Sequence, residues 1–301
     1  MSKSHRYSDP EVLAKIASLS LRARRVVEGT ISGLHRSPFR GFNVEFADYR
    51  EYSPGDDLRR LDWRALGRSD RYYIKQFEEE SNLRATLMLD TSASMRYGNG
   101  PLNKFNYAAT LVASLANLLI EQRDPAGLAL FDKRHHTHLR PAATHAQLVR
   151  ILAALEAARP DGETDLGEVL ATLCDQLERR RLVVIVSDLL TDLESLFDGL
   201  SRFEHRGHET LIFQVLDPDE LELPFQDFVQ FKDIEGTEEL FADPATFRRA
   251  YIQAMEVFLA EVRDTCGRLR IDHVLMRTDQ DLGDALSQYL HLRGRRDSRA
   301  R

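Results

Sequence analysis

The feature that most constrains this 301-residue chain is a series of short apolar segments that alternate with amphipathic ones from residue 84 onward. The clearest apolar segment is Leu182–Val186, which reads LVVIV. Short runs of β-branched and aliphatic residues are typical of strands that are buried on both faces. Their alternation with helical periodicity predicts an α/β fold, with a Rossmann-like, mostly parallel central sheet and helices on both of its faces.

The same patterns predict where the elements lie and how the chain is organised. We expect strands at 72–77, 85–89, 127–131, 182–186, 210–215 and 270–275, an edge strand at 137–140, and helices at 10–32, 104–122, 145–157, 165–179, 192–205, 244–266 and 282–290. The corresponding domains are an N-terminal α+β segment (1–80), an α/β domain (81–290) and a basic, disordered tail (291–301).

Charge and cysteine content narrow the possible functions. Residues 81–290 carry 21 basic against 34 acidic side chains, which argues against a nucleic-acid ligand, because nucleic acid requires a basic face. Cys174 and Cys266 form no C-x-x-C pair, so we expect free thiols in a reducing compartment. The sequence has neither a signal peptide nor an apolar run long enough to span a membrane. We therefore expect a cytoplasmic protein.

Five oxygen-bearing residues are expected at one edge of the predicted sheet. Asp90, Ser92 and Ser94 follow the first strand of the α/β domain, and Asp188 follows the LVVIV strand. Thr164 lies in a turn that leads into a helix. Parallel sheets bind ligands at the carboxyl ends of their strands, where these residues would meet.

A set of oxygen donors of this kind indicates a site for a hard divalent cation. Carboxylate and hydroxyl oxygens suit Mg²⁺ or Mn²⁺ and disfavour zinc. Neutral hydroxyls leave much of the positive charge of a cation uncompensated, so the cation retains affinity for one more anionic ligand. An Asp or Glu of a partner protein can supply that ligand.

This pattern resembles the metal-ion-dependent adhesion site of von Willebrand factor type A domains. Asp90, Ser92, Ser94, Thr164 and Asp188 fill all five positions of that motif in the right order. The resemblance covers residues 84–290 and implies the type A fold. It also implies that the serines and the threonine coordinate a cation directly or nearly so, and that the aspartates act directly or through water.

A second resemblance lies upstream, in the segments GFNVEF at 41–46, REYSPGDD at 50–57 and LDWR at 61–64. They are similar to the signature of domain-of-unknown-function family fifty-eight, which precedes a type A domain. Many members of that family carry transmembrane helices, which this sequence lacks. The family is usually encoded beside MoxR-type AAA+ ATPases. The resemblance implies a non-enzymatic adaptor that works with such an ATPase, or with its client, in protein assembly or maturation.

Two other functional classes remain as alternatives. A magnesium-dependent, phosphatase-like hydrolase also places a carboxylate at a strand end, but it needs a second Asp two residues later as general acid, where this chain has Ser92. Walker and G-x-S-x-G motifs are absent from the sequence. The other alternative is a structural scaffold whose five-residue site stays empty.

Each motif also has a structural interpretation. Asp90 could cap a turn, and Thr164 and Asp188 could each cap a helix. The charged residues of 50–64 could fix the N-terminal segment or face a partner. His136 and His138 share a strand face that could bind zinc, although an exposed hairpin is the simpler interpretation. The acidic stretch 217–243 holds ten acids against Lys232 and is expected to be a solvated loop, or a surface for a basic partner.

Overall fold

The computed structural model describes residues 19–23, 26–27, 45–51, 73–78, 84–98, 103–132, 135–162, 165–177, 180–232, 234 and 239–286. The chain divides into two compact units, residues 39–83 and residues 1–38 together with 84–301. Leu19, Ala23 and Val27 belong to the larger unit and are buried there. The segment expected over 1–80 is therefore shared between the two units.

The smaller unit contains an antiparallel pair of strands. β1 (Glu45–Glu51) pairs with β2 (Tyr73–Glu78), with a register shift between Phe46 and Asp48. The sequence predicted β2 but not β1. The charged segment 50–64 lies outside the described residues, apart from the end of β1.

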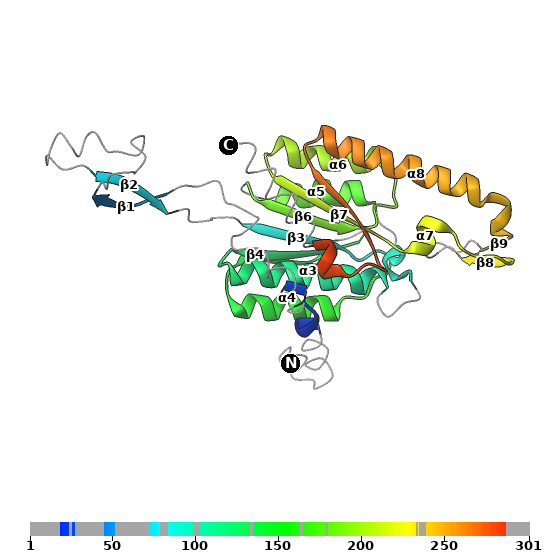
Figure 1. Cartoon of the computed structure of the whole chain (residues 1–301), viewed down its shortest axis with the longest axis horizontal. Helices are drawn as coiled ribbons and strands as arrows, with labels where there is room; N and C mark the ends of the chain where they lie inside the picture. The colour runs from blue at the N-terminus through cyan, green and yellow to red at the C-terminus, as the bar shows by residue number, and fades with distance from the viewer. Residues whose placement is uncertain are drawn as a thin grey trace. The chain divides into compact units, whose positions relative to one another are not determined.

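A six-stranded sheet forms the centre of the larger unit (Figure 1). Its strands are β3 (Ala85–Asp90), β4 (Ala126–Phe131), β5 (His135–Ala142), β6 (Leu182–Ser187), β7 (Glu209–Leu216) and β10 (Asp272–Arg277). Their order is β10-β7-β6-β3-β4-β5, and every pairing is parallel except β4 with β5. Counted along the larger unit, this is the doubly wound order of Rossmann-like folds, which reverses direction between β3 and β6. The predicted fold class and the edge strand are confirmed.

Helices cover both faces of this sheet. They are α3 (Lys104–Glu121), α4 (His145–Ala157), α5 (Leu166–Gln176), α6 (Leu193–His205) and α8 (Pro244–Arg268). Figure 1 shows α3 and α4 on one face, with α5, α6 and α8 on the other. The described part of the chain contains no helix that is both long and apolar enough to cross a membrane.

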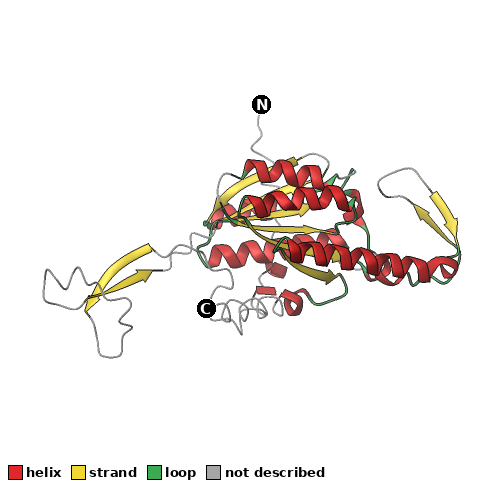
Figure 2. Cartoon of the chain, turned by 90° about the horizontal axis from the view of Figure 1, so that it is seen from above, coloured by secondary structure: helices red, strands yellow, loops and turns green. Residues whose placement is uncertain are grey.

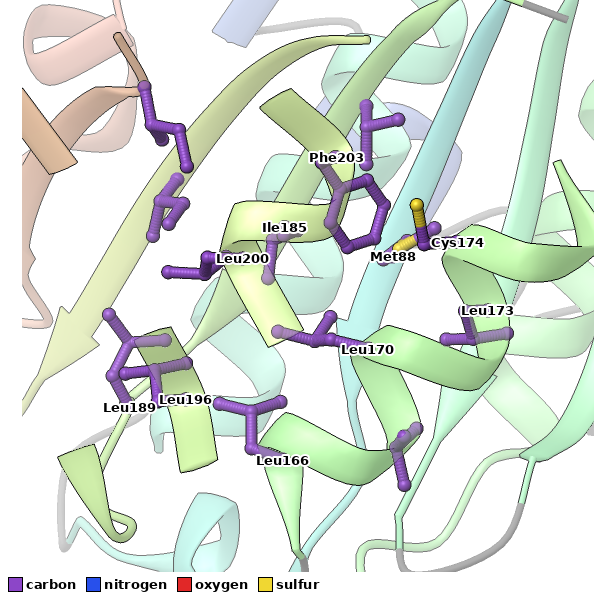
Figure 3. Packing of buried hydrophobic residues seen from close by; sticks show 14 of the residues in the cluster. Met88, Leu166, Leu170, Leu173, Cys174, Ile185, Leu189, Leu196, Leu200 and Phe203 are labelled. Atoms are coloured by element: carbon purple, nitrogen blue, oxygen red, sulfur yellow. The ribbon is translucent and has the colours of Figure 1, made fainter. Parts of the chain in front are cut away.

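The core between the sheet and helices α5 and α6 is built mainly from aliphatic side chains and the rings of Phe131 and Phe203. Figure 3 shows Phe203 and Leu200 of α6 packed toward Ile185 of β6 and Met88 of β3. All four side chains are fully buried. Cys174, on α5, lies in the same cluster, and both Cys174 and Cys266 are free thiols, as expected.

Helices α5 and α6 approach each other through two glycines. A Cβ atom added to Gly167 would lie 2.1 Å from the carbonyl oxygen of Ser195, and one added to Gly199 would lie 2.5 Å from the carbonyl oxygen of Gly167. Both distances are far below van der Waals contact. Only glycine therefore permits this crossing of the two helices.

The acidic stretch 217–243 is not the solvated loop that its composition suggested. It contains the short helix α7 (Pro218–Glu222) and an antiparallel hairpin of β8 (Val229–Lys232) and β9 (Glu239–Ala242). Figure 2 shows this hairpin beside the N-terminal end of α8. The rings of Phe225 and Phe247 each meet Phe231 edge to face. This apolar contact explains why an acidic segment adopts regular structure.

Candidate metal centre

Asp90 is the last residue of β3 and lies at the point where the strand order of the sheet reverses. Its side chain is buried, with 2% of the residue exposed. The backbone amide of Ser92 donates to Oδ1 at 2.8 Å, and the Ser187 hydroxyl donates to Oδ2 at 2.6 Å. Asp90 thus caps the turn that follows β3, as one structural interpretation of the sequence proposed, and it is also tied to the neighbouring strand.

The electrostatic environment of Asp90 disfavours its charged form. Burial first, and then the nearby Asp188, raise the pKa of this carboxyl to about 7, although the hydrogen bonds from Ser187 and Ser92 oppose that rise. Among the described residues, no basic side chain forms an ion pair with Asp90. A buried carboxylate beside a second acid is stabilised by gaining a proton or a cation.

Ser92 and Ser94 bring two hydroxyl groups together directly after this carboxylate. Their Oγ atoms lie 2.9 Å apart. Ser94 belongs to a short 3₁₀-helix, Ala93–Arg96, and Ser92 precedes it in extended backbone. The two hydroxyls expected to share one direction therefore do so.

Asp188 follows β6, the strand beside β3, and is also buried. Its Oδ1 accepts a hydrogen bond from the amide of Leu190 at 3.1 Å, and its backbone oxygen accepts one from the side chain of Gln214. Leu189, which lies between Asp188 and Leu190 in the chain, has a φ of 59°. This left-handed conformation is unfavourable for a branched, non-glycine residue. This strained turn fixes the direction of the Asp188 carboxylate. Asp188 caps no helix, because α6 is capped by Asp192.

Lys104 supplies the positive charge at this edge of the sheet. Its Nζ lies 2.7 Å from Oδ2 of Asp188 and 2.6 Å from Oε1 of Glu220, and its side chain is 0% exposed. Burial alone would lower the pKa of this lysine, but Asp188 and Glu220 outweigh that effect and raise it. Lys104 therefore stays charged and links the end of β6 to helix α7.

Thr164 lies outside the described residues, so its expected place at the site stays a prediction. The residues before it are positioned by backbone hydrogen bonds to the loop after β3. The amide of Ala93 donates to the oxygen of Gly162 at 2.9 Å, and the amide of Asp161 donates to the oxygen of Thr91 at 2.9 Å. The side chain of Asp165, rather than Thr164, caps helix α5. The helix-capping interpretation of Thr164 is therefore wrong.

The residues described at this edge fit a hard divalent cation. Two carboxylates and two hydroxyls provide oxygen donors only, and Asp90 has no positive partner within the described part of the chain. The described residues include no group of three or more His, Cys, Asp or Glu side chains that could hold a metal. A cation here would therefore depend on the hydroxyl oxygens as well as the carboxylates, as Mg²⁺ and Mn²⁺ can.

Three participants in this network were missed by sequence reasoning: Ser187, Lys104 and Glu220. A signal for Lys104 was present, because it lies three and seven residues before Tyr107 and Leu111 and therefore shares the buried face of α3. Ser187 and Glu220 carried no comparable signal. Their roles depend on which strands are neighbours and on where α7 packs.

The strand order, the antiparallel edge strand β5 and the polar cluster after β3 and β6 define an α/β domain of the von Willebrand factor type A kind. The chain belongs to the family described as "Protein of unknown function DUF58", whose model matches residues 48–258.

Relatives that align with most of the chain are found in mycobacteria. The chain is 29% identical over 279 residues to "Uncharacterized protein Rv1480" of Mycobacterium tuberculosis, and equally to "Uncharacterized protein Mb1516" of Mycobacterium bovis. Each alignment covers 91% of this chain and 87% of the relative.

Among solved structures, the chain is similar to BatB from Bacteroides thetaiotaomicron, with 15% identity and a TM-score of 0.48 over 71% of this chain and 99% of that one. It is also similar to the SpRpn10 VWA domain, with 16% identity and a TM-score of 0.42 over 68% of this chain and 95% of that one.

Proposed function

We propose that this chain is a metal-dependent protein-binding adaptor. Asp90, Ser92, Ser94, Thr164 and Asp188 would hold Mg²⁺ or Mn²⁺, and a carboxylate of a partner protein would complete the coordination. The observation that carries the proposal is the buried Asp90 carboxylate, which lies beside a second acid and two hydroxyls without a positive partner among the described residues.

Each residue of the proposed site would have its own role in binding the cation. Asp90 contributes a negative charge that is already oriented by Ser187 and by the backbone of Ser92. Ser92 and Ser94 contribute neutral oxygens, which add ligands without adding charge. Lys104 neutralises much of the charge on Asp188, so the edge as a whole does not over-compensate a divalent cation. A bound cation would supply an electrophilic centre for the partner carboxylate.

We propose no catalytic step at this site. The position at which an aspartyl-phosphate enzyme needs its general acid is Ser92, whose hydroxyl is hydrogen bonded to Ser94. The proposed partner is a protein with an exposed Asp or Glu. On the family resemblance alone, a MoxR-type AAA+ ATPase or the client of that ATPase is the first candidate.

The Lys104–Asp188 ion pair favours a second candidate function, a structural scaffold without a metal. Because an internal ammonium group already meets Asp188 at 2.7 Å, this edge of the sheet has a source of positive charge of its own. In that case the edge would be folded and complete without a cation, and a partner would bind elsewhere.

Metal binding separates these two functions. We expect calorimetry with Mn²⁺ to show one saturable site in the full chain, and Asp90→Asn to weaken it by at least about tenfold, since even supporting residues of metal sites have effects of that size. Asp243→Asn is the matched control, because Asp243 caps α8 and lies outside the proposed site. Heat of binding that is absent from the wild type, or equal in the wild type and Asp90→Asn, would favour the scaffold.

Partner binding tests the functional part of the proposal. We expect the affinity for a purified MoxR-type ATPase or its client to fall on addition of EDTA, and to fall in Ser92→Ala and Thr164→Ala while the fold is retained. Replacement of the partner's docking carboxylate by its amide should have the same effect. Binding that survives EDTA and both substitutions would place the docking surface elsewhere.

A further inference from the structure

A cavity of about 220 Å³ lies in the larger unit, next to the loop that carries the serine pair. Its lining includes residues 19 and 22 of the N-terminal helical stretch, the start of α3 and the residues that end α4. Three of the lining side chains are arginines, Arg22, Arg96 and Arg159, and only one is an acid, Glu156. The arginines come from three segments that are distant in the sequence, so the fold itself brings these like charges to one cavity.

Two of the three arginines have contacts that account for part of their placement. Nη1 of Arg159 donates to the backbone oxygens of Glu156 and Ala158, at 2.8 and 2.7 Å, and so satisfies carbonyls at the end of α4. Nη1 of Arg96 lies 3.8 Å from the exposed carboxylate of Asp161. Neither contact uses the carboxylate of Glu156.

Arg22 is the arginine that internal contacts leave unexplained. Its Nε is buried and has no hydrogen-bond partner in the part of the chain that the structure describes. A guanidinium group stays charged at any ordinary pH, and a buried donor without an acceptor is unfavourable. Arg22 lines the cavity together with Arg96 and Arg159, and three guanidinium groups around one cavity indicate that an anion belongs there.

We propose that this cavity binds a small oxyanion, a carboxylate or a phosphate group. Guanidinium groups match both in geometry, because their planar donors bind two oxygens at once. Asn103 and Asn106 also line the cavity, and Oδ1 of Asn103 accepts a hydrogen bond from the backbone N–H of Asn106. The volume lies below the roughly 300–1,000 Å³ of pockets for drug-sized ligands, so a single acidic group fits better than a large molecule.

The cavity uses none of the residues proposed to hold the cation, but it adjoins them in the chain. Arg96 follows Ser94 by two residues, and the loop from Arg159 to Gly162 is bonded to Ala93 through the oxygen of Gly162. An anion held by Arg96 and Arg159 would therefore restrain both loops. Its binding requires no metal, which makes it separable from the proposed function.

The test is titration calorimetry of the full chain in EDTA, at constant ionic strength set with sodium chloride. EDTA removes any cation, so a bound anion cannot be a ligand of the metal centre. The two probes are inorganic phosphate and the peptide acetyl-Gly-Glu-Gly-amide, which separate a phosphate source from a protein carboxylate. The variants are Arg22→Gln and Arg96→Gln, with Arg249→Gln as the matched control, because Arg249 is exposed on α8.

We expect the wild type to bind at least one probe saturably, and Arg22→Gln to weaken that probe by about tenfold, as loss of a charge-assisted hydrogen bond predicts. Arg249→Gln should bind like the wild type. Saturation by phosphate alone, by the peptide alone or by both supports the proposal and identifies the source. If Arg22→Gln fails to fold, a several-fold loss in the exposed Arg96→Gln variant supports it instead. The proposal would be overturned if neither probe saturates the wild type. It would also be overturned if the arginine variants that fold lose no affinity, or if Arg249→Gln loses as much.

Discussion

The sheet edge at β3 and β6 and the segment from α7 to the start of α8 differ in the side chains that they bury and expose. At the sheet edge, charged groups are buried and each is positioned by hydrogen bonds or an ion pair, as Asp188 is by Lys104. On the hairpin, apolar groups are exposed instead. Phe228 is 78% exposed and Phe241 is 70% exposed, while Phe231 is packed between two other rings.

This difference predicts which substitutions should destabilise the larger unit most. Polar groups in the sheet edge interact at low effective dielectric, so their removal is expected to be costly. The exposed phenylalanines of the hairpin have little contact area to lose. Exposed apolar side chains that lie together often form a binding surface for another molecule rather than part of a core. Three predictions make the contrast measurable.

The largest effect is expected at Lys104. Lys104→Met removes the charge between Asp188 and Glu220 and leaves one buried and one largely buried carboxylate without their partner. We expect the free energy of unfolding to fall by about 3–5 kcal/mol, the usual cost of breaking a buried ion pair. Urea denaturation in EDTA measures it.

Arg277→Met is the matched control for Lys104. Arg277 also meets two acids, Glu222 and Asp279, but all three side chains are partly exposed. Its loss should cost no more than about 1 kcal/mol. Equal effects of the two substitutions would show that burial does not distinguish these ion pairs.

An intermediate effect is expected from the protonation of Asp90. Its pKa of about 7 in the fold lies above the ordinary value of 3.8, so between these values the folded state holds a proton that the unfolded state has lost. Stability in EDTA should therefore fall as pH rises through this window, by about 1 kcal/mol per pH unit.

The variant Asp90→Asn isolates this contribution from other titrating groups. It cannot ionise, so the difference in unfolding free energy between the wild type and Asp90→Asn should grow from pH 4 to pH 7 in favour of the variant, as expected from the pKa window of Asp90. Parallel pH curves for the two proteins would contradict a raised pKa. Because a cation competes with the proton, Mg²⁺ should reduce the difference above neutral pH if the proposed site exists.

The smallest effect is expected on the hairpin. Phe241→Ser should change the free energy of unfolding by no more than about 0.5 kcal/mol, because the side chain has little buried area to lose. Phe231→Ser, on the paired strand, should cost more, since its ring contacts Phe225 and Phe247. A large effect of Phe241→Ser would show that this part of the hairpin contributes to the core after all.

Sequence periodicity was sufficient for the central sheet because its strands and helices carry strong local patterns. The burial of all six residues of β6 and the apolar face of α3 both follow from side-chain spacing. The hairpin was missed because β8 and β9 have four residues each and lie among acids. Four residues are too few for a period of two to emerge from an acidic background.

The part of the candidate site that could be predicted is the part that follows from the position of each residue relative to a strand end. Asp90, Ser92, Ser94 and Asp188 were expected at strand ends, and the structure places them there. The link from Lys104 to Glu220 joins residues 116 positions apart, and no local pattern encodes a pairing at that separation. Thr164 stays a prediction.

The crossing of α5 and α6 at Gly167 and Gly199 has a consequence for how this site can evolve. Asp165 caps α5 and accepts a hydrogen bond from the hydroxyl of Ser195 on α6. The separation of the two helices therefore sets the position of Asp165. A single added methyl group at Gly167 would push against the backbone of Ser195. Alanine, ordinarily the mildest replacement on a helix, would therefore force α5 and α6 apart at this crossing. Glycine at position 167 is therefore expected to matter as much for the start of α5 as the capping side chain of Asp165.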